Sequence, residues 1–222
     1  MLGGCVRRGE PAAAEPVDRN AESAVDYVAT QERAMHSLRA QFSASVWLDD
    51  GTLSRVSGVL LVVKPDRFRM RLMLPLGITV FDYVRDGADG WFSLPLASER
   101  DRTLPSQSMI DLSEVFLREP IDPLTCEIER SYDRLTDVRC GNHLFVIRAA
   151  QHHTLLERAY LDSVNVRYSE PADVDGFMLP FKIEVDQSIG TVLVKISKYD
   201  VNPRLEDSLF QPPEGATHIL LK

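Results

Sequence analysis

The strongest constraint on the fold is a six-residue run in which arginine alternates with large apolar side chains. Residues 67–72 read Arg-Phe-Arg-Met-Arg-Leu. Successive side chains of a β-strand point to opposite faces, so the run predicts a strand with one apolar and one polar face. We expect Arg67, Arg69 and Arg71 to lie on a solvated outer face.

The same period of two recurs over residues 41–48, 181–186 and 192–198. Short alternating segments separated by turn signals are typical of an antiparallel sheet or barrel. The turn candidates are Asp49-Asp50-Gly51, Asp86-Gly87, Asp89-Gly90, Cys140-Gly141-Asn142, Asp175-Gly176 and Ile189-Gly190.

Only two helices are expected. Residues 21–39 carry Val25, Val28, Met35 and Leu38 with a rough period of three to four, which predicts an amphipathic helix. A second, shorter helix is expected over residues 111–118. Two helices are too few to cover both faces of a parallel sheet. The pattern therefore predicts one mainly β (α+β) domain, a curved antiparallel sheet with the helices on its apolar side.

Composition and motifs exclude several function classes. The 222 residues include 25 Lys and Arg against 33 Asp and Glu, a net charge of −8, which disfavours a nucleic-acid partner. The longest apolar stretch, residues 72–81, is interrupted by Pro75 and Gly77 and has about half the ~20 residues of a membrane-spanning helix. No nucleophile elbow, phosphate-binding glycine loop or metal-ligand spacing is present, so we expect no catalysis, metal or cofactor.

The first residues resemble a lipid-attachment signal. Leu2-Gly3-Gly4-Cys5 resembles the lipobox of bacterial lipoproteins, although a four-residue match also arises by chance. The resemblance implies that Cys5 carries the lipid and that residues 1–20 form a flexible tether before a domain over residues 21–222. Only Met1 precedes Leu2, so the family's signal regions are expected upstream. The retention rule of these lipoproteins, with Val6 after the cysteine, implies the outer membrane.

Two cysteines remain if Cys5 is lipidated. Cys126 and Cys140 are 14 residues apart, a separation that two neighbouring strands can close. In an oxidising envelope compartment a disulfide is natural, and a loop of this length would contribute about 3 kcal/mol. Two reduced, half-buried thiols are the open alternative.

Four segments in order resemble the bacterial LolA/LolB-like lipoprotein carriers and receptors. They are residues 37–42, residues 58–69, the turn Asp86-Gly87 followed by Trp91, and residues 209–215. The resemblance implies a half-open antiparallel β-barrel, closed by helices, whose apolar interior holds acyl chains. The residues expected to line that cavity are Phe42, Val46, Leu60, Val62, Phe68, Met70, Leu72, Val80, Trp91, Phe181, Ile183 and Val194.

Two further sites follow from this resemblance. The apolar loop over residues 72–78 corresponds to a receptor loop that touches the outer membrane, which implies membrane contact by Leu74 and Leu76. The alternative is a loop folded over the barrel mouth as part of the core. A basic residue linked to cargo handling corresponds to Lys64, which as a plain alternative ends a strand in water.

The sequence thus favours a lipid-anchored protein on the periplasmic side of the outer membrane. We expect it to bind lipid or lipoprotein acyl chains for transport or insertion, with a periplasmic carrier or envelope protein as partner. A non-catalytic structural or assembly lipoprotein with the same fold is the main alternative. An enzyme or enzyme inhibitor on a lipocalin-like barrel is the third.

Overall fold

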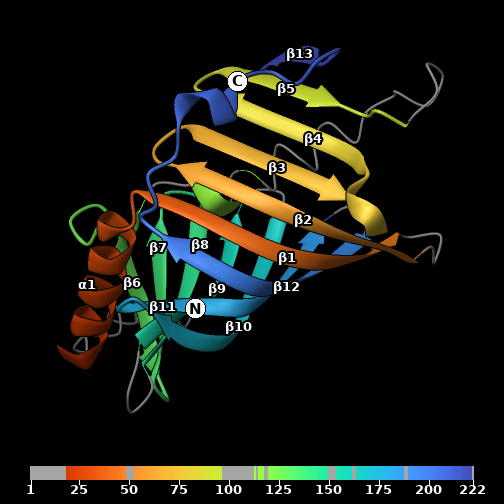
Figure 1. Cartoon of the computed structure of the whole chain (residues 1–222). Coiled ribbons are helices and arrows are strands. Elements are labelled where there is room, and N and C mark those ends of the chain that lie inside the picture. The colour runs from red at the N-terminus through yellow and green to blue at the C-terminus, as the bar shows by residue number, and fades with distance from the viewer. Residues whose placement is uncertain are drawn as a thin grey trace, which may run out of the picture.

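The computed structural model describes residues 19–48, 53–96, 113, 115–117, 120–149, 154–161, 164–187 and 190–221. Its main feature is one open antiparallel sheet of 13 strands, accompanied by an N-terminal helix (Figure 1). The prediction of a mainly antiparallel β fold with few helices is therefore confirmed. The sheet curves strongly (Figure 1).

The strands follow one another as neighbours over most of the sheet. Their order is β13-β5-β4-β3-β2-β1-β12-β11-β10-β9-β8-β7-β6, so β13 and β6 form the two edges. Their bounds are β1 (Ser37–Leu48), β2 (Leu53–Val63), β3 (Arg67–Met73), β4 (Thr79–Asp86), β5 (Asp89–Ser93), β6 (Glu127–Tyr132), β7 (Leu135–Cys140), β8 (His143–Ala149), β9 (Thr154–Leu161), β10 (Val164–Val174), β11 (Phe177–Gln187), β12 (Gly190–Val201) and β13 (Thr217–Leu220). Two 3-10 helices, η1 (Pro75–Gly77) and η2 (Asp207–Phe210), complete the described elements.

The helix α1 spans Arg19–Ala34 and ends earlier than the predicted residue 39. Leu38 fits both a helical and a strand pattern, and in the structure it pairs with Val62 of β2 and Val201 of β12. The side chain of Asn202 holds the junction between the end of α1 and the start of β1. Its side-chain amide donates to the Ala34 carbonyl, while its oxygen accepts from the backbone N–H groups of His36 and Ser37. The helix end is thereby capped by a residue remote in sequence.

Most of the core lies on the concave face of the sheet. Buried residues of α1, including Val25 and Val28, belong to the same apolar cluster as inward-facing residues of the strands. Gly58 is required where Phe42 crosses the neighbouring strand, because a Cβ there would lie 2.4 Å from the Phe42 ring. The curved sheet and α1 therefore enclose one continuous apolar interior.

The outer face of β3 and β4 is less exposed to solvent than the alternation of polar and apolar residues predicts. Asp82 is only 3% exposed and accepts hydrogen bonds from both Arg69 and Arg71. Arg69 also donates to the Leu209 carbonyl, and Arg67 lies over the Phe210 ring. The solvated position predicted for Arg69 is wrong because the segment with η2 folds back over this face.

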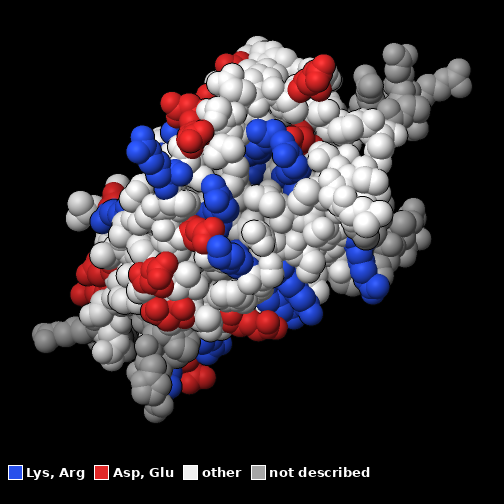
Figure 2. Space-filling view, in the orientation of Figure 1, with Lys and Arg blue, Asp and Glu red and all other residues white. Residues whose placement is uncertain are grey.

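Beyond that covered area, basic and acidic side chains are interspersed on the outer face shown in Figure 2. A second, smaller apolar cluster lies beneath η2. It joins Leu61, Val84 and Phe210 on the side of the sheet opposite the main core. The sheet is thus apolar on both faces in this region.

Three of the predicted turns connect strands, at residues 87–88, 141–142 and 175–176. The turn predicted at Asp89-Gly90 is wrong, since both residues belong to β5 and Gly90 pairs with Arg85 and Ile219. Residues 49–51 and Ile189 lie outside the described residues. Within the second predicted helix, residues 113 and 115–117 are helical and the others are not described.

Candidate ligand-binding cavity

The interior contains a cavity of about 140 Å³ between α1 and the concave face of the sheet. Val28 of α1 and Met35, just beyond it, line one side. Leu179 and Ile183 of β11 line another, and Phe116 of the helical turn also faces the cavity. The walls are therefore largely apolar and come from segments far apart in the sequence.

Two hydroxyl groups at the cavity wall are bonded to backbone carbonyls. The Tyr199 hydroxyl donates to the Pro180 carbonyl at 2.6 Å, and the Ser37 hydroxyl donates to the Pro203 carbonyl at 2.8 Å. Burial raises the pKa of Tyr199 above the ordinary value of a phenol, so this hydroxyl keeps its proton and remains a donor. These contacts hold two wall residues in place without adding a charge to the wall.

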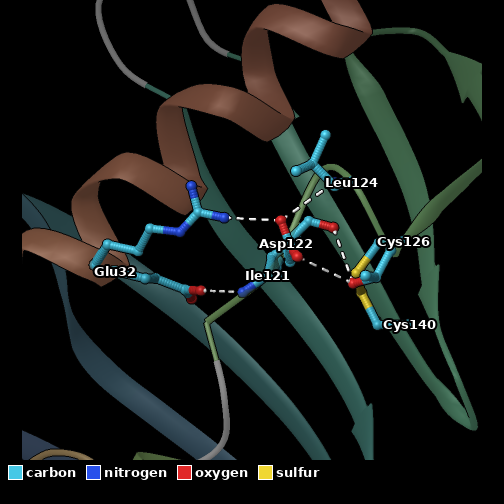
Figure 3. Close-up of a disulfide and its surroundings, with 8 residues drawn as sticks. Glu32, Ile121, Asp122, Leu124, Cys126 and Cys140 are labelled. Atoms are coloured by element: carbon cyan, nitrogen blue, oxygen red, sulfur yellow. Dashed lines mark hydrogen bonds and ion pairs between the residues drawn. A yellow bond between two sulfur atoms is a disulfide. The ribbon is translucent and has the colours of Figure 1, made fainter.

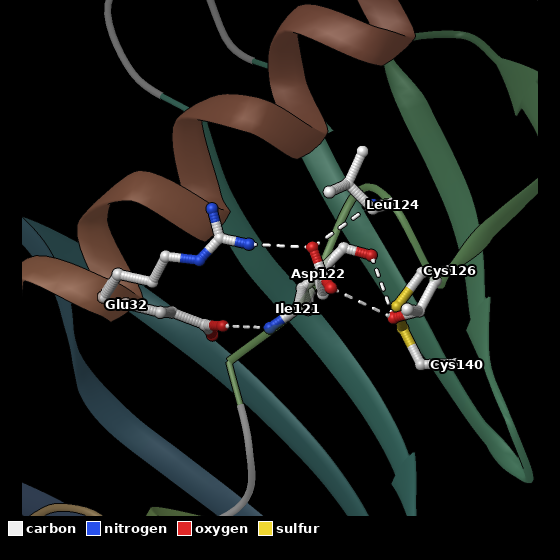
Figure 4. A network of polar contacts seen from close by, with 8 residues as sticks. Glu32, Ile121, Asp122, Leu124, Cys126 and Cys140 are labelled. Atoms are coloured by element: carbon white, nitrogen blue, oxygen red, sulfur yellow. Dashed lines mark hydrogen bonds and ion pairs between the residues drawn. A yellow bond between two sulfur atoms is a disulfide. The ribbon is translucent and has the colours of Figure 1, made fainter.

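Polar contacts tie the C-terminal half of α1, which lines the cavity, to the turn before β6 (Figure 4). The Glu32 carboxylate accepts from the Ile121 N–H at 2.9 Å, and Arg33 pairs with Asp122 at 2.9 Å. The Asp122 carbonyl in turn accepts from the Cys126 N–H at 2.9 Å.

A disulfide between Cys126 and Cys140 joins that turn to the end of β7 (Figure 3). The sequence left open whether these cysteines are bonded or reduced, and in the structure they are bonded. The disulfide, the Asp122 turn and α1 therefore form one connected support beside the cavity.

The structure brings only part of the sequence-predicted cavity set to this site. Val62 and Ile183 line the cavity, and so does Lys64. The remaining inward-facing positions fill the core instead of lining open space. Phe42, Leu60, Phe68, Met70 and Val194 are buried in the main cluster, and Leu72 and Phe181 are partly buried against it.

The other three residues of the predicted cavity set are Trp91, Val80 and Val46. Trp91 packs in the outer cluster near Val84, so its predicted inward orientation is wrong. Its neighbour Phe92 takes the inward position, because adjacent residues of a strand face opposite sides. Val80 is partly exposed and belongs to neither described cluster. The side chain of Val46 lies outside the described residues.

Sequence reasoning missed several lining residues, notably Leu156, Tyr168 and the start of β11. Residues 177–180 read Phe-Met-Leu-Pro, an unbroken apolar run without alternation. Such a run indicates a strand covered on both faces. That signal was present in the sequence, but it does not reveal that one of the faces borders a cavity.

The predicted membrane-contact loop is exposed. Leu76 is 98% exposed, and Leu74 and Ile78 also face solvent. Leu76 has a φ of 77°, in the left-handed region, within η1. This placement excludes the alternative in which Leu76 packs into the core over the barrel mouth.

Two absences hold for the described part of the chain, and the predicted lipid-attachment residue lies beyond it. Its His, Cys, Asp and Glu side chains form no group of three or more suited to a metal ion. Its helices are too short or too polar to cross a membrane. Cys5 lies outside the described residues.

Neither a family model nor a curated protein matches the sequence. Solved structures do match the fold. A LolA superfamily protein from Nitrosomonas europaea has a TM-score of 0.57 at 13% identity, over 86% of this chain and 97% of that one. A DUF1329 family protein from Desulfovibrio piger has a TM-score of 0.58 at 13% identity, over 87% and 96%.

A domain named for outer membrane lipoprotein sorting, from Vibrio parahaemolyticus, has a TM-score of 0.54 at 12% identity. It covers 86% of this chain, which covers 97% of that domain. At these identities the likeness concerns the fold. The chain therefore has the LolA/LolB-like fold that its sequence segments resemble.

Proposed function

We propose that the protein binds the acyl chain of a lipid or lipoprotein in the cavity beneath α1. The observation that carries the proposal is the apolar cavity between α1 and β11, within a LolA/LolB-like fold. Burial of each methylene group stabilises a bound chain by about 0.8 kcal/mol, so no bond chemistry is required for binding or release. The function is carriage or insertion, and not turnover.

The size of the cavity sets how much of a chain it accepts without movement. A dry cavity of about 150 Å³ in another protein holds one benzene molecule. The cavity here, about 140 Å³, therefore accepts a short part of a ~16-carbon chain. Deeper insertion requires α1 or the turn with Phe116 to move away from β11.

Lys64 is placed to respond to such movement. Lys64 lines the cavity, and its ammonium group donates to the Glu32 carbonyl of α1 at 3.3 Å. Displacement of α1 by cargo would break this contact between Lys64 and α1. This geometry supports a cargo-handling role for Lys64 over that of a strand end in water.

Membrane attachment completes the proposal. Cys5 carries the lipid anchor, the residues before α1 form the tether, and the domain that begins with α1 at Arg19 binds lipid on the periplasmic side of the outer membrane. The exposed Leu74 and Leu76 contact the bilayer when cargo is transferred. A periplasmic carrier or envelope protein supplies or receives the cargo.

The binding step is tested by filling the cavity. Leu156→Trp places a larger side chain at the cavity wall and should reduce uptake of a fluorescent acyl-chain probe by at least tenfold. Leu209→Trp is the matched control, since Leu209 is also partly buried but lies in the outer cluster. Equal uptake by both variants and the unchanged protein would contradict binding at this cavity.

A structural or assembly role is the second candidate, and one observation favours it. Much of the concave interior is filled by the protein's own side chains, including Phe68 and Met70. A scaffold would keep the cavity closed, so the unchanged protein would take up no probe. The same titration therefore distinguishes the two functions.

A further inference from the structure

Gln31 occupies a position on α1 where the helix pattern calls for an apolar residue. Ala24, Val28, Gln31 and Met35 follow one another at spacings of three and four, which places them along one side of the helix. Ala24 and Val28 are buried in the core, and Val28, Gln31 and Met35 all line the cavity. Gln31 is thus a polar residue in a largely apolar wall, with its amide oxygen buried beside the cavity.

The hydrogen bonding of this amide is incomplete. Its Oε1 atom is buried and has no hydrogen-bond partner among the described residues. Other polar side chains at the cavity are engaged: Ser37 and Tyr199 donate to backbone carbonyls, and Glu32 accepts from the Ile121 N–H. An unpaired buried acceptor is unfavourable for the protein alone, which points to a partner supplied by a ligand.

We propose that Gln31 Oε1 accepts a hydrogen bond from a neutral donor, a hydroxyl or amide N–H, located where the ligand's apolar chain begins. This inference rests on the proposed function and specifies its ligand class as chains that carry such a donor. An ether oxygen or a carboxylate at the same place would set two acceptors against each other. Gln31 therefore determines specificity, while the apolar wall supplies most of the binding energy.

The test uses pairs of isomers that differ in donor capacity. Octanol and heptyl methyl ether have the same atoms, but only the alcohol donates a hydrogen bond. Calorimetric titration of the full chain gives the ratio of the two dissociation constants. We expect that ratio to favour the alcohol about tenfold more in the unchanged protein than in Gln31→Leu. The two isomers are solvated differently in water, but this difference affects the ratio equally in both proteins. It therefore cancels when the ratios of the two proteins are compared.

A second pair identifies the source of the donor. N-methyloctanamide has one N–H, and its isomer N,N-dimethylheptanamide has none. If Gln31→Leu reduces the preference for the donor more in the amide pair than in the alcohol–ether pair, the natural donor is the N–H of an N-acyl group. If the reduction is larger in the alcohol–ether pair, the natural donor is a lipid hydroxyl.

Met35→Leu is the matched control, because it alters a neighbouring wall residue without changing an acceptor. It should keep the preference of the unchanged protein. Thermal unfolding of Gln31→Leu should occur at or above the temperature of the unchanged protein, since an unpaired acceptor is removed.

The outcomes separate this inference from the proposed function. If every isomer binds but Gln31→Leu leaves both ratios unchanged, the role of Gln31 is overturned and chain binding stands. If neither these isomers nor the fluorescent acyl probe binds the unchanged protein, the proposed function fails and the inference fails with it.

Discussion

Two regions of the interior are built from the same alternating strands, yet one is packed and the other is hollow. Around Phe68 the interior is filled: the ring is fully buried, 5.9 Å from the Tyr83 ring and 6.1 Å from the Phe116 ring. Beneath α1, Ile183 and Val62 face a cavity instead. The difference arises from what packs opposite each strand, which strand periodicity does not encode.

The contrast has an energetic consequence. A packed aromatic side chain contributes both its burial and its contacts, whereas a residue at a cavity wall lacks partners on one side. The packed region therefore contributes more to the stability of the fold than the cavity wall does. Substitutions in the two regions should separate stability from binding.

The largest expected effect is the loss of a packed ring. Phe68→Ala should lower the free energy of unfolding by about 3–5 kcal/mol, because it leaves a void in a filled core. Phe177→Ala, at the partly exposed cavity wall, should cost less than half as much and raise probe uptake. Denaturant titration measures both variants, and equal costs would remove the distinction between the regions.

Removal of the disulfide comes next. The double variant Cys126→Ser, Cys140→Ser should lose about 3 kcal/mol of stability, since the bond closes a loop of 14 residues. The Asp122 turn contacts α1 through Arg33, so its release should also make the helix over the cavity more mobile. Hydrogen exchange of α1 amides measures this, with Arg33→Ala as the milder comparison. Unchanged exchange in the double variant would show that the disulfide does not support the cavity.

The smallest effect on stability is expected at the exposed loop. Leu76→Glu should change the free energy of unfolding by no more than about 0.5 kcal/mol, because the side chain is 98% exposed. Transfer of a bound probe to phospholipid vesicles should nevertheless slow several-fold. Leu124→Glu is the matched control, since Leu124 is 93% exposed in the turn beside α1. Equal rates for both variants would contradict membrane contact by Leu76.

The sequence predicts the strands of this fold well because their alternation is local. Prediction from the sequence fails where contacts with a distant segment determine the secondary structure or the burial of a residue. Leu38 satisfies two periods, and only pairing with Val62 and Val201 assigns it to a strand. Arg69 is covered because η2 returns to the outer face, a contact between residues 140 positions apart.

The candidate site was predictable only in part. Ile183 lies in an alternating strand, Val62 lies in the apolar run of residues 59–63, and both line the cavity. Trp91 was assigned to the wrong face because Phe92 beside it is an equally good core residue. Gln31 gave a usable signal, a polar residue at an apolar helix position, but its significance depends on the buried, unpaired oxygen that only the structure reveals.

Native mass spectrometry of the protein, incubated with phospholipid vesicles and then separated from them, tests the central claim most directly. We expect one bound lipid or acylated molecule per chain, with occupancy strongly reduced by Leu156→Trp and retained by Leu209→Trp. A spectrum that shows only the unliganded mass would contradict it, as would equal occupancy in the two tryptophan variants.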